Sequence, residues 1–159
     1  MTAEEYINRL LNISTTKHGL LSDILDLTRT QTNTITEDGI EELGKIIARK
    51  QEKIDEINKL DEEFDVYFKR LKQLLNVKNL DELSGLEIKG VDKLQHIVKG
   101  IIDTVKEISL IEKQNRDKAN ALLNKLGEHL DTISKGKRMS SAYMQESVQT
   151  YSYFIDKKK

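Results

Sequence analysis

The feature that most constrains the fold is a seam of positions spaced alternately three and four residues apart between residues 40 and 75. It contains Ile40, Leu43, Ile47, Lys50, Ile54, Ile57, Asp61, Phe64, Phe68, Leu71 and Leu75. This spacing puts the side chains on one face of an α-helix and is typical of a coiled coil. A helix with such a face has to bury it against other helices. The chain is therefore expected to form a helical bundle.

Similar patterns predict one helix on each side of this segment. The first is expected over residues 3–35, where Thr2 and Glu5 can form a capping box. Its main seam is expected to contain Tyr6, Leu10, Ile13, Leu20, Ile24 and Leu27. The third is expected over residues 91–134, and Gly136 provides its stop. Three polar residues interrupt its seam, where they cost stability but can fix helix register: Glu112, Asn115 and His129.

The connections between these helices complete the fold prediction. Residues 34–39 read as a tight reversal, and residues 76–90 as a loop with at most a short helical turn over Leu80 to Leu83. The chain has no proline and only 8 glycines, as long helices require. We expect an all-α fold: an elongated antiparallel three-helix bundle or coiled coil over residues 1–136, with helices at about 3–35, 39–75 and 91–134. Residues 137–159 are expected to be a flexible tail.

Charge and composition exclude several classes of function. The 26 lysines and arginines nearly balance the 27 aspartates and glutamates, so no strong field attracts nucleic acid. No segment has the roughly 18 apolar residues that a membrane span needs, and the N-terminus does not read as a signal peptide. The absence of cysteine fits a reducing compartment. We expect a cytoplasmic protein, monomeric or weakly dimeric, with no nucleic-acid partner and no membrane insertion.

No pattern in the chain predicts catalysis or cofactor binding. The histidines His18, His96 and His129 lie on different helical stretches. Asp92 and His96 are four residues apart, but the further ligands of a closed metal site are missing. There is no GxSxG motif and no glycine-rich phosphate loop. The sequence predicts a protein that is not an enzyme and needs no metal or cofactor.

The C-terminal tail is the one segment for which a binding role is favoured over a structural one. It contains three of the five tyrosines and one of the three phenylalanines. Large aromatic side chains on a segment with weak patterning suggest an element that orders on a partner. The candidate anchors are Met139, Tyr143, Met144, Val148, Tyr151, Tyr153 and Phe154. The alternative is that these side chains pack back onto the bundle.

Two segments resemble a known family. The run Asp38–Leu43, followed by Lys50–Asp61, resembles the second helix of FlgN-type flagellar export chaperones of Gram-positive bacteria, and Tyr153–Lys159 resembles the ending of clostridial members. The resemblance implies a cytoplasmic type III secretion chaperone. Such a protein binds hook-filament junction proteins near its C-terminus, here within Leu122–Ile155, keeps them unassembled and delivers them to the export gate.

Three other functions remain open at this point. A structural or adaptor coiled-coil protein that mediates protein–protein association would carry the same seams, and its mass in solution would distinguish it. A protein that binds single-stranded nucleic acid would use the basic, aromatic tail, although the neutral net charge argues against it. An enzyme would need a metal at His96 or His129.

Overall fold

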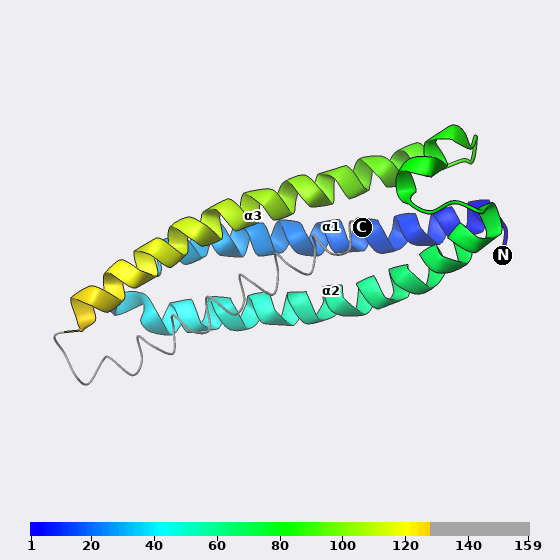
Figure 1. Cartoon of the computed structure of the whole chain (residues 1–159). Helices are drawn as coiled ribbons and strands as arrows, with labels where there is room; N and C mark the ends of the chain where they lie inside the picture. Colours follow the sequence, from blue (N-terminus) through cyan, green and yellow to red (C-terminus); the bar gives the residue numbers. More distant parts are fainter. Residues whose placement is uncertain (128–159) are drawn as a thin grey trace.

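The computed structural model describes residues 1–127. They form three long helices, α1 (Ala3–Thr32), α2 (Ile40–Leu75) and α3 (Val91–Leu126), and two 3-10 helices, η1 (Glu37–Gly39) and η2 (Leu80–Gly85). The long helices lie side by side, with α2 antiparallel to the other two (Figure 1). The predicted all-α fold, an elongated antiparallel three-helix bundle, is confirmed for the described residues.

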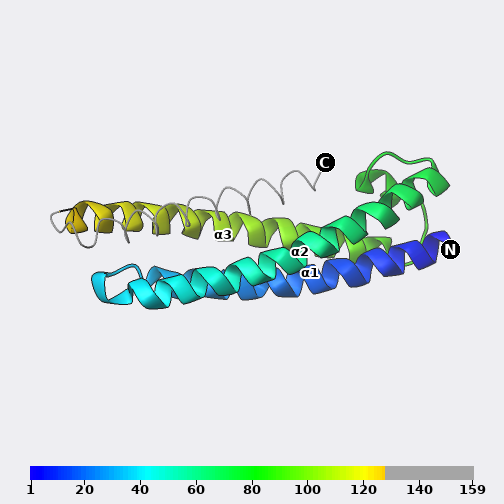
Figure 2. The ribbon, with the colours of Figure 1, turned by 90° about the horizontal axis from the view of Figure 1, so that it is seen from below.

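Helix α1 is the central element of the bundle. It packs along its length against both α2 and α3, whereas Cα atoms of α2 and α3 come within 8 Å of each other almost nowhere. Ion pairs accompany both contacts: Lys53 of α2 lies 3.3 Å from Asp23, and Arg29 lies 2.5 Å from Glu107 of α3. Figure 1 shows α2 and α3 on different sides of α1, and in the turned view of Figure 2 α2 overlaps α1. The bundle therefore has two close helix–helix contacts, and a wider separation between the backbones of α2 and α3.

The first helix has the predicted start and an earlier end. The Thr2 hydroxyl accepts a hydrogen bond from the Glu5 amide at 3.2 Å, and the Glu5 carboxylate accepts one from the Thr2 amide at 3.0 Å. At the other end, the Thr34 amide and hydroxyl both donate to the Gln31 carbonyl, at 3.0 and 2.8 Å. This turn stops the helix at Thr32 and directs Ile35 into the core, where it is buried.

The connection between α2 and α3 is a packed cap on one end of the bundle. Asn76 has a left-handed backbone (φ 53°) that ends α2, and the Asn79 side chain accepts a hydrogen bond from the Glu82 amide at 3.1 Å. Helix η2 includes the short turn predicted over Leu80 to Leu83, and it buries Leu83 completely. The connection thus contributes a core residue.

The core consists of three apolar clusters along the bundle axis. The cap cluster contains Ile7, Leu10, Leu71, Leu83, Val91 and Leu94. The middle cluster contains Leu21, Ile24, Ile54, Ile57, Ile101, Val105 and Ile108. The far cluster contains Ile35, Leu43, Ala119, Leu122 and Leu126. Polar residues are buried at the chain positions between these clusters.

The predicted main seam of α1 was partly wrong. Tyr6, Leu20 and Leu27 are only half-buried. The residues that face the core include four polar ones: Ser14, Lys17, Thr28 and Gln31. These lie in two series spaced by seven with Ile7, Leu10, Leu21 and Ile24, which keeps them on one face of a helix in a coiled coil. Because polar residues occupy four core positions, a search for apolar side chains alone selects the half-buried residues Tyr6, Leu20 and Leu27 beside this seam.

Candidate functional site

The largest buried polar group in the described residues joins all three helices. Lys50 of α2 has a side chain only 1% exposed, and its ammonium group forms an ion pair with Glu112 of α3. It also donates a hydrogen bond to Gln31 Oε1 of α1 at 2.9 Å. A buried charge pair is expensive to desolvate and is tolerated where additional hydrogen bonds satisfy it. These contacts bring one side chain from each helix to the same level.

Helices α1 and α3 extend this polar group by hydrogen bonds through Asn115. Its amide nitrogen donates to the Thr28 carbonyl at 3.2 Å, and its side-chain oxygen accepts from the Thr32 hydroxyl at 2.7 Å. Glu112 and Asn115, predicted as polar interruptions of the third seam, are 3% and 0% exposed. We call the group formed by Lys50, Glu112, Gln31, Thr28 and Asn115 the Lys50 layer.

A second buried ion pair lies between the cap and middle clusters. Lys17 Nζ of α1 is 2.6 Å from Asp61 Oδ1 of α2, and the two side chains are 9% and 4% exposed. The pair, which we call the Lys17 layer, joins α1 to α2. The sequence placed Asp61 on the seam of its helix without identifying Lys17 as its partner. The signal was present, because Lys17 falls at seam spacing between Leu10 and Ile24.

An aromatic and charged group lies on the surface where α1 meets α2. The rings of Tyr6 and Tyr67 are 6.3 Å apart, and the Arg9 guanidinium is 5.4 Å from the Tyr67 ring. Arg9 also pairs with Glu63, whose hydrogen bond and negative charge raise the pKa of the guanidinium. The group is solvent-facing, so it contributes side-chain packing and little net electrostatic stability.

The histidines do not form a common site in the part of the chain that the structure describes. The His18 ring lies against Gly100 of α3, and His96 is exposed on the same helix. His129 lies outside the described residues. Across residues 1–127, no group of three or more histidine, cysteine, aspartate or glutamate side chains is placed to hold a metal ion. No helix in this range is both long and apolar enough to cross a membrane.

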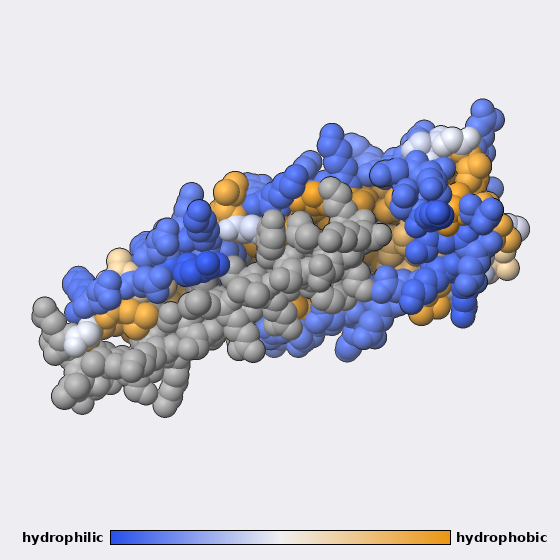
Figure 3. Space-filling model, in the orientation of Figure 1, coloured by the Kyte–Doolittle hydropathy of each residue, from blue (hydrophilic) through white to orange (hydrophobic). Residues whose placement is uncertain are grey.

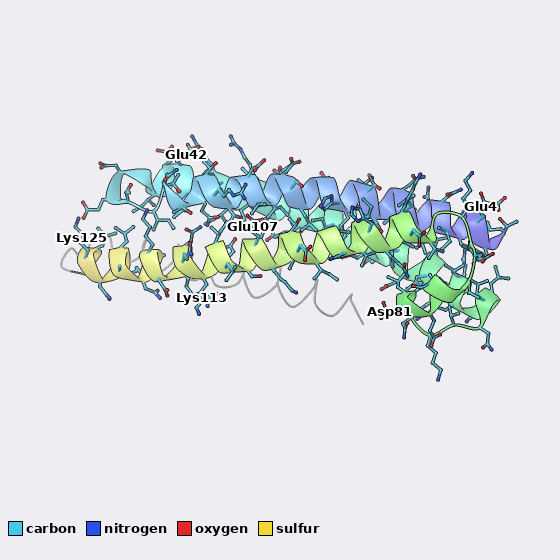
Figure 4. All side chains as sticks on the ribbon, turned by 90° about the horizontal axis from the view of Figure 1, so that it is seen from above. Glu4, Glu42, Asp81, Glu107, Lys113 and Lys125 are labelled. Atoms are coloured by element: carbon cyan, nitrogen blue, oxygen red, sulfur yellow. The ribbon has the colours of Figure 1, made fainter. Side chains whose placement is uncertain are left out.

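The predicted binding residues cannot be placed in this site. Met139, Tyr143, Met144, Val148, Tyr151, Tyr153 and Phe154 all lie outside the described residues. What residues 1–127 provide is the scaffold from which the C-terminal segment leaves, next to the far cluster at Leu126. The outer surface of this scaffold is charged: Figure 4 shows Glu42, Lys113 and Lys125 among many charged side chains on the outside of the bundle.

Comparison with known proteins gives one clear result. The family model described as FlgN protein matches residues 1–150, which is nearly the whole chain. Searches among curated proteins and solved structures give no match. The matched range includes all three helices and most of the segment that follows them. The chain therefore belongs to the FlgN family, whose members are flagellar export chaperones and not enzymes.

Proposed function

We propose that the protein is a cytoplasmic chaperone of flagellar type III secretion that binds hook-filament junction proteins. It keeps them unassembled and delivers them to the export gate. The observation that supports this proposal is the match of the FlgN family model to residues 1–150. A helical bundle with a charged exterior suits a binding role, because it stays soluble while another segment holds the client.

A client of this kind needs a cover for its apolar helical surface. Proteins that polymerise only after export expose, before assembly, the faces through which they later pack. Such faces drive aggregation or early assembly in the cytosol. An amphipathic segment of the chaperone can cover them by helix-to-helix packing. The chaperone must then offer apolar side chains that its own core does not use.

Within residues 1–127 the exposed large apolar side chains are few. The large apolar residues that remain exposed are Met1, Val66, Leu74, Leu86 and Leu110. On the face drawn in Figure 3, the atoms that are not grey are mainly hydrophilic, with some apolar patches. We therefore assign client binding to the C-terminal segment 137–159, with Met139, Tyr143, Met144, Val148, Tyr151, Tyr153 and Phe154 as anchors. Methionine adapts to irregular grooves, and tyrosine buries a large area at small entropic cost.

Calorimetric titration of a purified junction protein into the full chain tests this assignment. Tyr151→Ala is expected to weaken binding by roughly 30-fold, the effect of losing about 2 kcal/mol at an interface hot spot. The matched control is Leu110→Ala, which removes an apolar side chain 65% exposed on α3. It is expected to leave affinity unchanged, and both variants should keep the helical circular dichroism of the parent. Equal affinity of the two variants would refute the assigned binding site.

A complementary experiment tests the identity of the client. The full chain is used to capture proteins from the cytosol of a flagellated source strain, and the bound proteins are identified by mass spectrometry. Recovery of hook-filament junction proteins is expected. If purified junction proteins fail to bind the full chain in solution, the chaperone proposal is wrong for these clients, and the adaptor interpretation gains support.

A further inference from the structure

Between α2 and α3 the helix backbones are further apart than on the α1 side, although their core side chains meet in the middle of the bundle. Two residues of α3 mark the side that touches α1: Glu107 pairs with Arg29, and Lys118 donates to the Thr32 carbonyl. On the other flank of the buried α3 seam runs a series with a spacing of seven, which lies on one stripe of a coiled-coil helix: Ile102, Ser109, Arg116 and Leu123. This stripe points away from α1, on the side of α3 that α2 does not reach closely.

Helix α2 has a matching stripe. Its contacts to α1 come from Lys53, which pairs with Asp23, and from Tyr67, which packs against Tyr6. Opposite these contacts, again at a spacing of seven, lie Gln51, Asn58 and Asp65, with Ile47 beside them. We call the surface formed by the two stripes the α2/α3 face. Since Cα atoms of α2 and α3 rarely come within 8 Å, this face lies between two helices that are both held by α1.

The side chains of this face differ from those of the outer surface. Ile102, Ser109 and Leu123 are half-buried, and the α2 stripe is formed mainly by uncharged amides. One step further around α3, three successive exposed positions at a spacing of seven are lysines: Lys99, Lys106 and Lys113. The face is therefore less charged than the outside of the same helix, as expected of a surface that packs against another segment.

A segment with matching chemistry follows α3 in the same chain. Residues 139–155 contain one charged side chain, Glu146, although charged residues make up 33% of the whole chain. Met144, Val148, Tyr151 and Ile155 follow one another at spacings of four, three and four. This spacing gives one apolar stripe if the segment is helical. Glutamine, serine and threonine occupy about half of the other positions, which suits a neighbour lined by amides and hydroxyls.

We propose that the chain's own segment 139–155 docks as a helix on the α2/α3 face, antiparallel to α3. Described structure ends at Gly127, so residues 128–138 are available for the reversal. Seventeen helical residues span about 26 Å, roughly half the length of α3. The segment would lie beside the half of α3 that contains the Lys50 layer, with Val148 and Tyr151 facing the bundle. The result is a four-helix bundle of up-down-up-down order.

Attachment in the same chain favours this occupant over a second copy or a separate partner. A short connection gives the segment an effective concentration of roughly millimolar at the face, which exceeds ordinary protein concentrations in solution. The docking needs no client, so it stands or falls independently of the proposed chaperone function. Where both hold, a client that uses Val148 or Tyr151 must compete with the α2/α3 face for the same side chains.

Paramagnetic broadening in the full chain tests the docking. The absence of cysteine allows a single spin label to be attached at Ser152→Cys, beside the apolar stripe of the segment. We expect loss of amide signals on the α2/α3 face, at Ser109 of α3 and Gln51 of α2, and unaffected signals at Asp26 on the outer side of α1. The label is expected to cause no such loss after the added changes Val148→Asp and Ile155→Asp, with the signals of residues 1–127 otherwise at their parent positions.

A mixed sample separates docking within one chain from docking between chains. Spin-labelled protein without isotope is added to isotope-labelled protein without a spin label, and no broadening is expected. Broadening in the mixture would identify a second copy as the occupant and overturn the proposal. Broadening confined to the outer side of α1, or its absence from the α2/α3 face in the singly labelled chain, would overturn it as well.

Discussion

Both buried polar layers pair a lysine with a carboxylate inside the bundle, but they differ in how many helices they join. The Lys17 layer is an ion pair between α1 and α2, with Lys17 9% and Asp61 4% exposed. The Lys50 layer is deeper, and it joins all three helices through hydrogen bonds from Lys50 and Asn115. Buried charges contribute little net stability, but they penalise any alignment in which they lose their partners. We infer that the Lys17 layer aligns α1 with α2, and that the Lys50 layer also aligns α3.

The largest expected effect is that of Glu112→Ala. It leaves the Lys50 ammonium in a core position without its carboxylate, and breaking such a pair costs up to about 5 kcal/mol in unfolding free energy. Urea denaturation followed by circular dichroism measures the loss. The control is Glu107→Ala, on the same helix, whose 48% exposed side chain pairs with Arg29. That variant should lose less than about 1 kcal/mol. Equal losses would show that the Lys50 layer is not energetically distinct from a surface pair.

Asp61→Ala tests the Lys17 layer, and it should lower the unfolding free energy by about 3 kcal/mol, less than Glu112→Ala does. Lys17 is slightly more exposed than Lys50, and its long side chain can move its ammonium group toward water. The same urea experiment measures the change, with Glu62→Ala as a control at the neighbouring exposed position. A cost for Asp61→Ala above that of Glu112→Ala would reverse the order that we infer for the two layers.

A double replacement separates stability from alignment. Lys50→Met combined with Glu112→Leu removes both charges and keeps their approximate volumes. Such replacements of buried ion pairs are often neutral or stabilising, so the unfolding free energy should stay within about 2 kcal/mol of the parent. If the layer fixes alignment, amide spectra of the variant should show more than one conformer for α3. A single set of signals in a stable variant would exclude that role.

The comparison of the layers also shows how far the sequence could predict this molecule. The helix seams, the Thr2 capping box and the burial of Asn115 follow from periodicity and local chemistry. The pairing of Lys50 with Glu112 does not, because it depends on how far each helix slides along α1, which one-dimensional spacing leaves open. The burial of Lys17 was also not predicted. Burying a lysine is costly unless a carboxylate pairs with it, and the partner Asp61 is distant in the sequence. The client anchors lie beyond Gly127, so they remain a prediction.

The smallest expected effect comes from the edge of the Lys50 layer. The Thr28 hydroxyl donates to the Ile24 carbonyl at 2.7 Å and lies 3.5 Å from Glu112 Oε1. Thr28→Val keeps the shape of the side chain and removes this polar contact, at an expected cost of about 1 kcal/mol. Thr30→Val is a matched control, because the Thr30 hydroxyl makes the same local bond, to the Asp26 carbonyl at 3.0 Å, on the exposed surface.

The difference between these two threonine variants isolates the contribution of the layer from that of the local helix bond. Both variants lose a hydroxyl bonded to the carbonyl four residues earlier, and in both a valine of the same branched shape replaces the threonine. Thr30→Val should change the unfolding free energy by less than about 0.5 kcal/mol, as is usual for surface substitutions. If Thr28→Val costs no more than this, the Thr28 hydroxyl does not support Glu112, and Thr28 belongs to the Lys50 layer only through its backbone carbonyl, which accepts from Asn115.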